Sequence, residues 1–331
     1  MPADKVLVLG SNSFSGASFV DYLLSQGAEV LGVSRSPEPH CAFLPYRWPG
    51  RDRAFRFFQY DLNRDLDAIL ELTRRQRPGY FVNFAAQSMV AESWKNPDHW
   101  FMTNAVLTVR LHEGLRHMDF LQKYVHVTTP EVYGSTSGFI REDTLFNPST
   151  PYAVSRAAGD MSLRTFFEAY RFPVVYTRAA NVYGAGQQLY RIIPRTILFI
   201  LLGRKLQLHG GGQSRRSFIH MRDVSEATWR VAKDAPAGEA YHISTNEIVT
   251  IREVVERICA KLEVRFADCV EVVGERLGKD AAYMLDSSKL RSTLDWQDRI
   301  SLDWGLDECI AWVKTYFDDL KQQPYDYIHK P

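Results

Sequence analysis

The stretch "TPYAVSR", residues 150–156, places a tyrosine four positions ahead of an arginine. Side chains four positions apart on a helix are neighbours, so Tyr152 and Arg156 can form a phenol–guanidinium pair. A phenol has an ordinary pKa of about 10 and is a poor base at neutral pH. A cation at roughly 5 Å, with an effective dielectric of about 20, stabilises the phenolate by about 3 kcal/mol, or about two pKa units. The spacing therefore indicates a base for a hydroxyl proton, with a core tyrosine and a surface arginine as the structural alternatives.

A phosphate-binding turn is indicated by "GSNSFSG", residues 10–16. It follows an apolar run and opens a stretch with apolar residues at helical spacing. Small residues at such a turn let the backbone approach a pyrophosphate, which then lies at the helix N-terminus. A serine stands where the middle glycine is usual, and a plain strand–helix turn is the alternative. The predicted dinucleotide contacts in this turn are Gly10, Ser13, Phe14 and Gly16.

The second apolar run ends in "VSRS", where an acidic residue would accept a hydrogen bond from a ribose 2'-hydroxyl. Ser34 and Arg35 offer donors and a positive charge instead, which suits a 2'-phosphate. The sequence therefore favours NADP over NAD, with NAD left open and a solvated surface arginine as the alternative. Two further motifs, "YDL" and "NFAAQS", end the next two strands, and Asp61 is expected to meet the adenine amino group. The predicted cofactor contacts in these motifs are Asp61, Leu62, Ala85, Ala86 and Gln87.

The elements that must position these residues alternate along the first half of the chain. Strands are predicted at 5–10, 29–36, 55–62, 80–88, 123–129 and 173–184, and helices at 16–27, 66–78, 104–118 and 151–171. Such alternation predicts an α/β fold with a Rossmann-type doubly wound parallel sheet. After about residue 181 the alternation stops, which indicates a smaller C-terminal α/β lobe. We expect residues 1–180, with a returning segment near 215–245, to bind the dinucleotide, and residues 181–331 mainly to bind the substrate.

Composition narrows the class of protein. The 331 residues are 45% hydrophobic, and 40 Lys and Arg balance 39 Asp and Glu, so neither nucleic acid nor an acidic membrane is an expected partner. The four cysteines are scattered and none lies in a CxxC pair, which indicates free thiols in a reducing compartment and no metal site. No signal peptide is visible, and the apolar run 192–203 is too short to span a bilayer. We expect a cytoplasmic protein.

Several ordered motifs together resemble the extended short-chain dehydrogenase/reductase superfamily. More narrowly, they are similar to the nucleotide-sugar 4,6-dehydratases of the dTDP-glucose and GDP-mannose types. The resemblance covers nearly the whole chain, and ordered motifs at compatible spacing are more specific than any one of them. The motifs are "AAQSMV", "TPEVYGS", "PYAVSRAAGD", "RAANVYG", "IIPRTI", "RRSFIHMRDV" and "GEAYHIS".

The resemblance implies roles for four catalytic residues. Tyr152 would be the base at the C4 hydroxyl, and Tyr152 and Arg156 would both also contact the cofactor. Arg156 stands where the family has a lysine that also holds the nicotinamide ribose. Thr129 would hydrogen-bond the reacting sugar oxygen, and Glu131 would remove the C5 proton; a strand-end cap and a helix N-terminal charge are the alternatives. Pro130 replaces the aspartic acid of the dTDP-glucose type and cannot donate a proton. The leaving C6 hydroxyl would then take its proton from Glu131 or from water.

The same resemblance implies a nucleotide-sugar site and a homodimer. Arginine forks suit phosphate oxygens, although any one of these arginines could be a plain surface charge. The nucleotide base stays open between uracil, thymine, guanine and cytosine. The helices near 104–118 and 152–170 carry more apolar residues than one core-facing stripe needs, and in the family such helices form a dimer through a four-helix bundle. The implied substrate contacts are Ser88, Asn181, Arg191, Arg216 and Arg276.

The expected reaction is a 4,6-dehydration of a nucleotide-diphosphate hexose with a bound nicotinamide cofactor. A 4-epimerase, or an enzyme limited to C4 oxidation or 5,6-elimination, is the first alternative. Pro130 favours that alternative, whereas Glu131 argues against a simple epimerase, which needs no base at C5. A dinucleotide-binding regulator without turnover is a third reading, supported only by Arg156.

Overall fold

The computed structural model describes residues 3–50, 55–274 and 284–330. Its centre is a seven-stranded sheet in which every pair of neighbouring strands is parallel, in the order β12-β7-β5-β4-β1-β2-β3. The strands are β1 (Lys5–Leu9), β2 (Glu29–Ser34), β3 (Phe55–Gln59), β4 (Tyr80–Asn83), β5 (Lys123–Val127), β7 (Val174–Ala179) and β12 (Ala240–Ile243).

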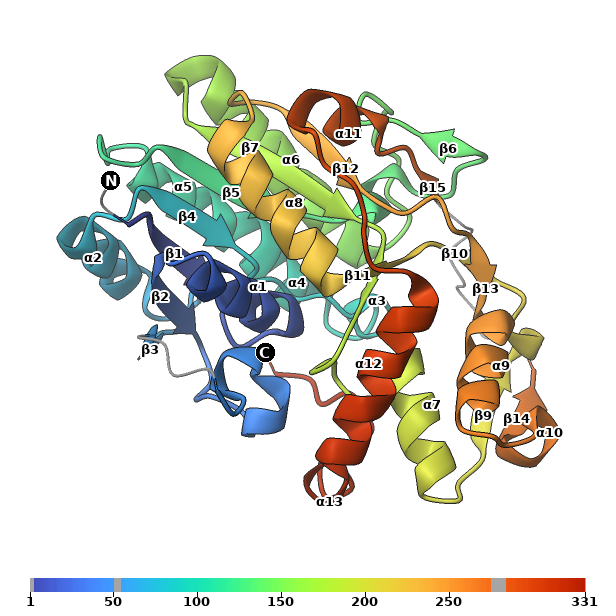
Figure 1. Cartoon of the computed structure of the whole chain (residues 1–331). Helices are drawn as coiled ribbons and strands as arrows, with labels where there is room; N and C mark the ends of the chain where they lie inside the picture. The colour runs from blue at the N-terminus through green and yellow to red at the C-terminus, as the bar shows by residue number, and fades with distance from the viewer. Residues whose placement is uncertain (1–2, 51–54, 275–283, 331) are drawn as a thin grey trace.

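Helices cover both faces of this sheet (Figure 1). One face carries α1 (Phe14–Ser25) and α8 (Met221–Asp234), and the other carries α2 (Leu66–Gln76), α5 (Leu107–Leu115) and α6 (Pro151–Tyr170). Strand β1 shows why both faces need cover: Val6 and Val8 pack with the α1 side, and Leu7 with the α2 side. The predicted doubly wound α/β fold is confirmed.

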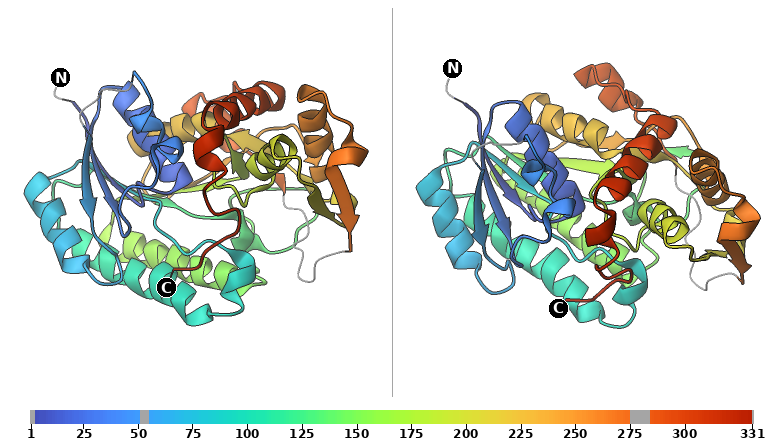
Figure 2. Two further views of the ribbon diagram at one scale, coloured as in Figure 1. Left: turned by 90° about the horizontal axis from the view of Figure 1, so that it is seen from below. Right: turned by 60° about the horizontal axis from the view of Figure 1, so that its bottom comes forward.

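A smaller group of elements lies beside the carboxyl ends of the strands (Figures 1 and 2). Its apolar core is built by α7 (Ile192–Leu201), α9 (Ile251–Lys261) and α12 (Leu302–Thr315). Three pairs of short strands lie next to it: β8 (Asn181–Tyr183) with β11 (Phe218–His220), β9 (Leu206–His209) with β14 (Val270–Val273), and β10 (Arg215–Arg216) with β13 (Val249–Thr250). A fourth pair, β6 (Phe139–Ile140) with β15 (Met284–Leu285), packs instead with Tyr133 and with Ala157 of α6. The remaining short helices are α3 (Val90–Ser93), α4 (Pro97–Phe101), α10 (Phe266–Cys269), α11 (Ser288–Leu294) and α13 (Phe317–Leu320).

Two expected elements differ in the structure. The strand expected at 173–184 is two strands, because the chain changes partners where β7 ends. The Ala180 N–H donates to Ile243 of β12, and the Asn181 N–H donates to Ser217 beside β11. The helix expected at 104–118 begins as a π-helical segment, Met102–Val106, before it continues as α5.

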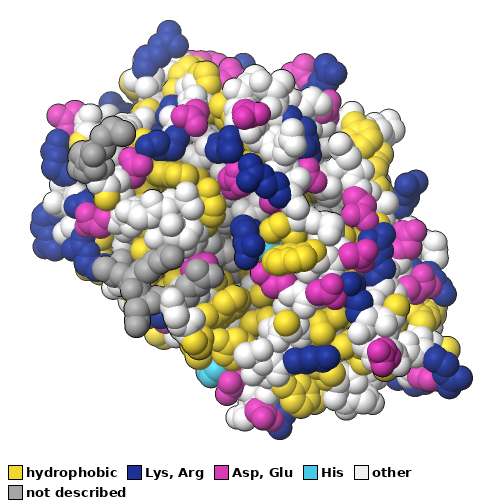
Figure 3. Space-filling model, viewed as in Figure 1, with side chains coloured by type: hydrophobic (Ala, Val, Ile, Leu, Met, Phe, Trp, Pro, Cys, Tyr) yellow, Lys and Arg dark blue, Asp and Glu magenta, His cyan; other side chains and the backbone are white. Residues whose placement is uncertain are grey.

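The surface carries both signs of charge. Figure 3 shows acidic and basic side chains mixed over the face seen there, as the near-equal numbers of 40 and 39 lead one to expect. Within the described residues, no helix is both long enough and apolar enough to cross a bilayer. The run 192–203 instead forms α7, which packs against α9 and α12. All four cysteines are described, and all four are free thiols.

Candidate active site

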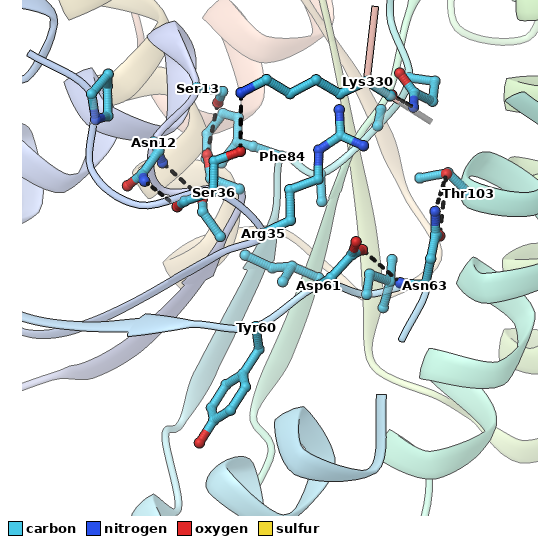
Figure 4. A pocket seen from close by; sticks show the side chains of 18 of the residues that line it. Asn12, Ser13, Arg35, Ser36, Tyr60, Asp61, Asn63, Phe84, Thr103 and Lys330 are labelled. Carbon is cyan, nitrogen blue, oxygen red and sulfur yellow. Dashed lines mark hydrogen bonds between the residues drawn. The ribbon is translucent and has the colours of Figure 1, made fainter. Parts of the chain in front are cut away.

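A cavity of about 520 Å³ lies at the carboxyl ends of β1, β2, β3 and β4. The strand order reverses between β1 and β4, and such a switch point is where open parallel sheets bind ligands. Figure 4 shows lining side chains, most of which come from the segments that follow these strands, whereas Lys330 comes from the end of the described chain. The predicted cofactor residues in the lining are Gly10, Ser13, Ser34, Arg35, Asp61, Leu62, Ala85, Ala86 and Gln87.

The turn after β1 has the shape that a phosphate needs. Gly10 has φ +85°, and a Cβ there would lie 2.7 Å from the backbone nitrogen of Ala85. A Cβ at Gly16 would overlap the carbonyl oxygen of Gly10. The Ser13 hydroxyl donates to that oxygen at 2.8 Å and accepts from the Gly16 N–H at 3.0 Å. Ser13 thus caps α1 and closes the turn, and the turn fits a dinucleotide pyrophosphate.

Four predicted cofactor contacts are not part of the cavity lining: Phe14, Gly16, Tyr152 and Arg156. Phe14 is 6% exposed and packs in the core beneath α1, and Gly16 is covered by the turn. The Ser34 hydroxyl already accepts a hydrogen bond from the Asn12 N–H at 2.9 Å. The lining residues that sequence reasoning missed include Asn63, Thr103 and Lys330.

A second group of predicted residues meets where β5 ends and α6 begins. The Thr150 hydroxyl accepts from the Ala153 N–H at 3.1 Å and caps α6, so that Tyr152 lies in the first turn of the helix. Thr129 follows β5, and its side chain is hydrogen-bonded to the Tyr152 phenol. Glu131 is close enough for its charge to act on the same phenol. The structure therefore brings together three of the four predicted catalytic residues, and Arg156 follows one turn later.

The electrostatics of Tyr152 differ from the expectation. Burial raises the pKa of Tyr152 above its ordinary value, and the charge of Arg156 opposes that rise without reversing it. The Thr129 hydrogen bond and the Arg191 charge also lower the pKa, whereas Glu131 raises it. The expected net fall of the pKa was wrong for this structure, because the cost of desolvating a phenolate in the protein interior exceeds the attraction of the guanidinium.

Arg156 is not a surface residue. Its side chain is 4% exposed, and its Nη2 donates a hydrogen bond to the carbonyl oxygen of Val127 at the end of β5. This contact fixes the guanidinium against the end of β5, just before Thr129. The surface alternative for Arg156 is therefore excluded.

A buried polar network, which the sequence did not indicate, continues from this group beneath α6. Asp160 is 2% exposed, accepts from Arg178 at 2.8 Å, and lies 3.4 Å from the Nε2 atom of His126. Burial alone would raise the pKa of Asp160, but Arg178 and His126 outweigh it and lower the pKa to about 2. Arg178 also donates to the Tyr133 hydroxyl at 3.1 Å. The network holds α6 to β5 and β7.

The predicted substrate residues are more dispersed. Arg191 precedes α7, and its charge lowers the pKa of Tyr152, so it lies on the tyrosine side of the site. Asn181 begins β8, Arg216 lies in β10, and Ser88 is exposed after β4. Arg276 lies outside the described residues.

Comparison with known proteins supports the resemblance to the nucleotide-sugar 4,6-dehydratases. A profile of the family described as "GDP-mannose 4,6 dehydratase" matches residues 7–309. A Sinorhizobium fredii protein named "Probable dTDP-glucose 4,6-dehydratase" is 31% identical, over 93% of this chain and 92% of that protein. The dTDP-glucose 4,6-dehydratase of Bacillus anthracis, solved with NAD, superposes with a TM-score of 0.86 at 28% identity and covers 96% of this chain and 99% of its own. DesIV of Streptomyces venezuelae, a dTDP-glucose 4,6-dehydratase solved with NAD, also has a TM-score of 0.86, at 29% identity and with 94% and 97% of the two chains covered.

Proposed function

This chain belongs to the GDP-mannose 4,6-dehydratase family, and on that premise we propose that it is a nucleotide-sugar 4,6-dehydratase dependent on a nicotinamide dinucleotide. The observation that carries the proposal is the grouping of Tyr152, Thr129 and Glu131 where β5 meets α6. The cavity of about 520 Å³ opens at the neighbouring strand ends of the same sheet. The three relatives named above carry the name 4,6-dehydratase, and the two solved ones hold NAD.

Each residue of the site has its own role in the proposed reaction. The turn around Gly10 and Ser13 would hold the pyrophosphate of the dinucleotide. When bound, the nicotinamide supplies a hydride acceptor for C4 of the hexose and a donor for C6. Tyr152 takes the proton of the C4 hydroxyl, and Thr129 orients the same oxygen. The ketone at C4 acidifies the hydrogen at C5, which Glu131 removes as water leaves from C6.

Pro130 bears on how that water leaves. Pro130 is buried and begins a short 3₁₀ turn, Pro130–Tyr133. Because it is a proline, it has neither a side-chain donor nor a backbone N–H. We assign the proton for the C6 hydroxyl to Glu131, which has just received one from C5. When hydride then reaches C6, C5 takes up one proton from solvent, and the proton that Tyr152 took from the C4 hydroxyl is released, so that the whole reaction balances.

A 4-epimerase is the second candidate, and Pro130 is the observation that favours it. Glu131 argues against it, because epimerisation at C4 requires no base at C5. A regulator without turnover has less support, because Arg156, the residue that suggested it, is buried beside the end of β5, just before Thr129.

We also propose a homodimer. Apolar side chains are exposed on the helical layer formed by the π-helical segment, α5 and α6: Met102, Val106, Val109, Val154 and Met161. Such a face fits a four-helix bundle with a second copy. Light scattering should give twice the chain mass for the purified protein, and Met161→Glu should halve it. Val272→Glu, at an exposed valine on β14, is the matched control and should leave the mass unchanged.

We also propose that the two parts of the chain bind different ligands. Residues 1–180 with the returning segment 215–245 would bind the dinucleotide, and α8 and β12 of that segment support this by completing the central sheet. The remainder of 181–331 would bind the nucleotide sugar, as the position of Asn181 at the start of β8 supports.

Four free thiols favour a reducing compartment, and hence the cytoplasm.

The activity is tested by incubating the purified protein with a panel of hexoses linked to dTDP, GDP, UDP and CDP. The proposal predicts a product lighter by one water that gives the alkaline absorbance of a 4-keto sugar. An unchanged mass with an altered sugar NMR spectrum would identify an epimerase instead. Absence of turnover with every member of the panel would support the regulator.

A further inference from the structure

The segment 324–330 runs from the small lobe to the strand ends of the central sheet, and contacts hold it along the way. Figure 2 shows it leaving α13 and ending near the helices that follow β4. Asp326 forms an ion pair with Arg195 of α7 at 2.6 Å. The ring of His329 stacks on that of Trp100 in α4, with 5.1 Å between the centroids. We call this segment the strap, because it joins the small lobe to the sheet.

The strap ends on Gln87, a buried residue in the segment that follows β4. The Nε2 atom of Gln87 donates to the carbonyl oxygen of Lys330 at 2.7 Å. On its other side, Lys330 donates from Nζ to the Ser36 hydroxyl at 3.3 Å, as Figure 4 shows. A buried amide that loses its acceptor is left with an unpaired donor, which is costly. The strap therefore fixes the conformation of the Gln87 side chain.

The backbone of Gln87 is held by the side-chain amide of Asn104. The Oδ1 atom of Asn104 accepts from the Gln87 N–H at 2.9 Å, and its Nδ2 atom donates to the Gln87 carbonyl oxygen at 2.9 Å. Asn104 is buried and lies in the π-helical segment Met102–Val106. In a π-helical turn the backbone bonds join residues five apart, so its side chains do not keep the spacing of α5.

The same Asn104 side chain reaches α6. Its Nδ2 atom also donates to the hydroxyl of the buried Ser155 at 3.0 Å. The Ser155 hydroxyl in turn donates to the carbonyl oxygen of Tyr152 at 2.7 Å. The two helical segments are in close contact here, because a Cβ at Gly159 would lie 2.7 Å from the Asn104 carbonyl oxygen. An unbroken chain of hydrogen bonds thus runs from the strap to Tyr152.

We propose that the strap positions Tyr152, by holding Gln87, Asn104 and Ser155 in the one arrangement that fixes the first turn of α6. Any other arrangement would leave buried polar groups of this chain unpaired. The inference rests on the proposed function, in which Tyr152 is the base. His329, Asn104 and Ser155 are then positioning residues, which act through Tyr152 and do not line the dinucleotide cavity.

The first test is backbone hydrogen exchange of the purified protein, followed by mass spectrometry of its peptides. His329→Ala removes the ring that stacks on Trp100 and so loosens the strap. Amides of residues 150–158 should then exchange at least about fivefold faster, while those of β1 and α1 stay unchanged. His329→Phe keeps a ring for the stack and should return exchange to within about twofold of wild type. The matched control is Ile328→Ala, a strap side chain that is 62% exposed, which should exchange as wild type does.

The second test is a double-mutant cycle on turnover, with saturating dinucleotide and the sugar that the panel identifies. Ser155→Ala breaks the chain of hydrogen bonds next to Tyr152. His329→Ala and Ser155→Ala should each lower kcat by about tenfold, with KM within about twofold, because a displaced base slows the chemistry more than it weakens binding. The double variant should lose little more than the worse single variant, since members of one network are not additive.

Three results would overturn the inference. They are wild-type exchange of residues 150–158 in His329→Ala, faster exchange spread equally over the whole sheet, and a double variant whose loss in kcat is the product of the two single losses. Hydrogen exchange needs no turnover, so the two proposals can fail separately. Dehydration by a protein whose His329→Ala variant exchanges as wild type does would refute this inference alone. The expected exchange in a protein that converts no nucleotide sugar would refute the dehydratase proposal alone.

Discussion

The Tyr152 phenol and the Arg156 guanidinium lie one turn apart on α6, and both are buried, with 8% and 4% of their surfaces exposed. Burial raises the pKa of the phenol, and the guanidinium works against that rise. Arg156 is held in place by its hydrogen bond to the carbonyl oxygen of Val127. The cation that tunes the proposed base is thus a fixed part of the interior.

Removing this cation should slow catalysis by a predictable amount. Arg156→Met takes away an attraction of about two pKa units, so the rate at neutral pH should fall about a hundredfold. The pH at which the rate rises should also move upward, because the phenol then ionises at higher pH. Arg156→Lys keeps a cation and should stay within about tenfold of wild type. Arg164→Met, on an exposed turn of the same helix, is the control; a similar loss there would remove the special role of Arg156.

Glu131→Gln should separate oxidation from elimination. The amide cannot accept the C5 proton, so the C4 ketone would form without loss of water. Quenched reactions should contain a 4-keto hexose that retains its C6 hydroxyl, in amounts no greater than the enzyme. Wild-type reactions in deuterium oxide should place deuterium at C5. A variant that still dehydrates at the wild-type rate would show that Glu131 is not the C5 base.

Asp160→Asn should cost stability because it leaves Arg178 buried without its carboxylate partner. Breaking such a buried pair by removing one member costs about 3–5 kcal/mol. The exposed pair between Arg164 and Glu168, with 3.1 Å between charged atoms, offers the control. Glu168→Gln on the same helix should cost less than about 1 kcal/mol in the free energy of unfolding measured with urea. Equal costs for the two variants would contradict the view that the network holds α6 to the sheet.

Two buried histidines should make the fold sensitive to acid. Burial lowers the pKa of His112 to about 3, and burial together with Arg178 does the same for His242. The unfolded chain protonates both near pH 6.5, so it binds more protons than the native state as the pH falls from about 6.5 towards 3. Stability should therefore drop by about 1.4 kcal/mol per pH unit for each histidine in that window. His112→Gln should reduce the slope of the urea midpoint against pH, and an unchanged slope would count against this assignment.

Much of the fold could be predicted because its signals are local. The apolar run ending at Gly10 and the helical spacing after it determine β1 and α1, and Gly10 has the positive φ that only glycine adopts readily. The pairing of Tyr152 with Arg156 likewise needed only the four-residue spacing of a helix.

What could not be predicted depends on contacts distant in sequence. The sign of the Tyr152 pKa shift depends on how much protein surrounds the phenol, which spacing alone does not reveal. The link between Asp160 and Arg178 joins a helix to a strand, and both residues look like ordinary surface charges in the sequence. Lys330 reaches Ser36 across a separation of 294 residues. No local pattern indicates that such a residue lines the cofactor cavity.

In the proposed reaction, Tyr152 initiates a dehydration in which the hydrogen of C4 ends at C6. The most direct test follows a nucleotide hexose carrying deuterium at C4, with wild-type protein and with Tyr152→Phe, by NMR and mass spectrometry of the product. We expect wild-type protein to yield a 4-keto-6-deoxy sugar with deuterium at C6, and the variant to lose at least about a hundredfold in rate. Deuterium that remains at C4, or a phenylalanine variant as active as wild type, would contradict it.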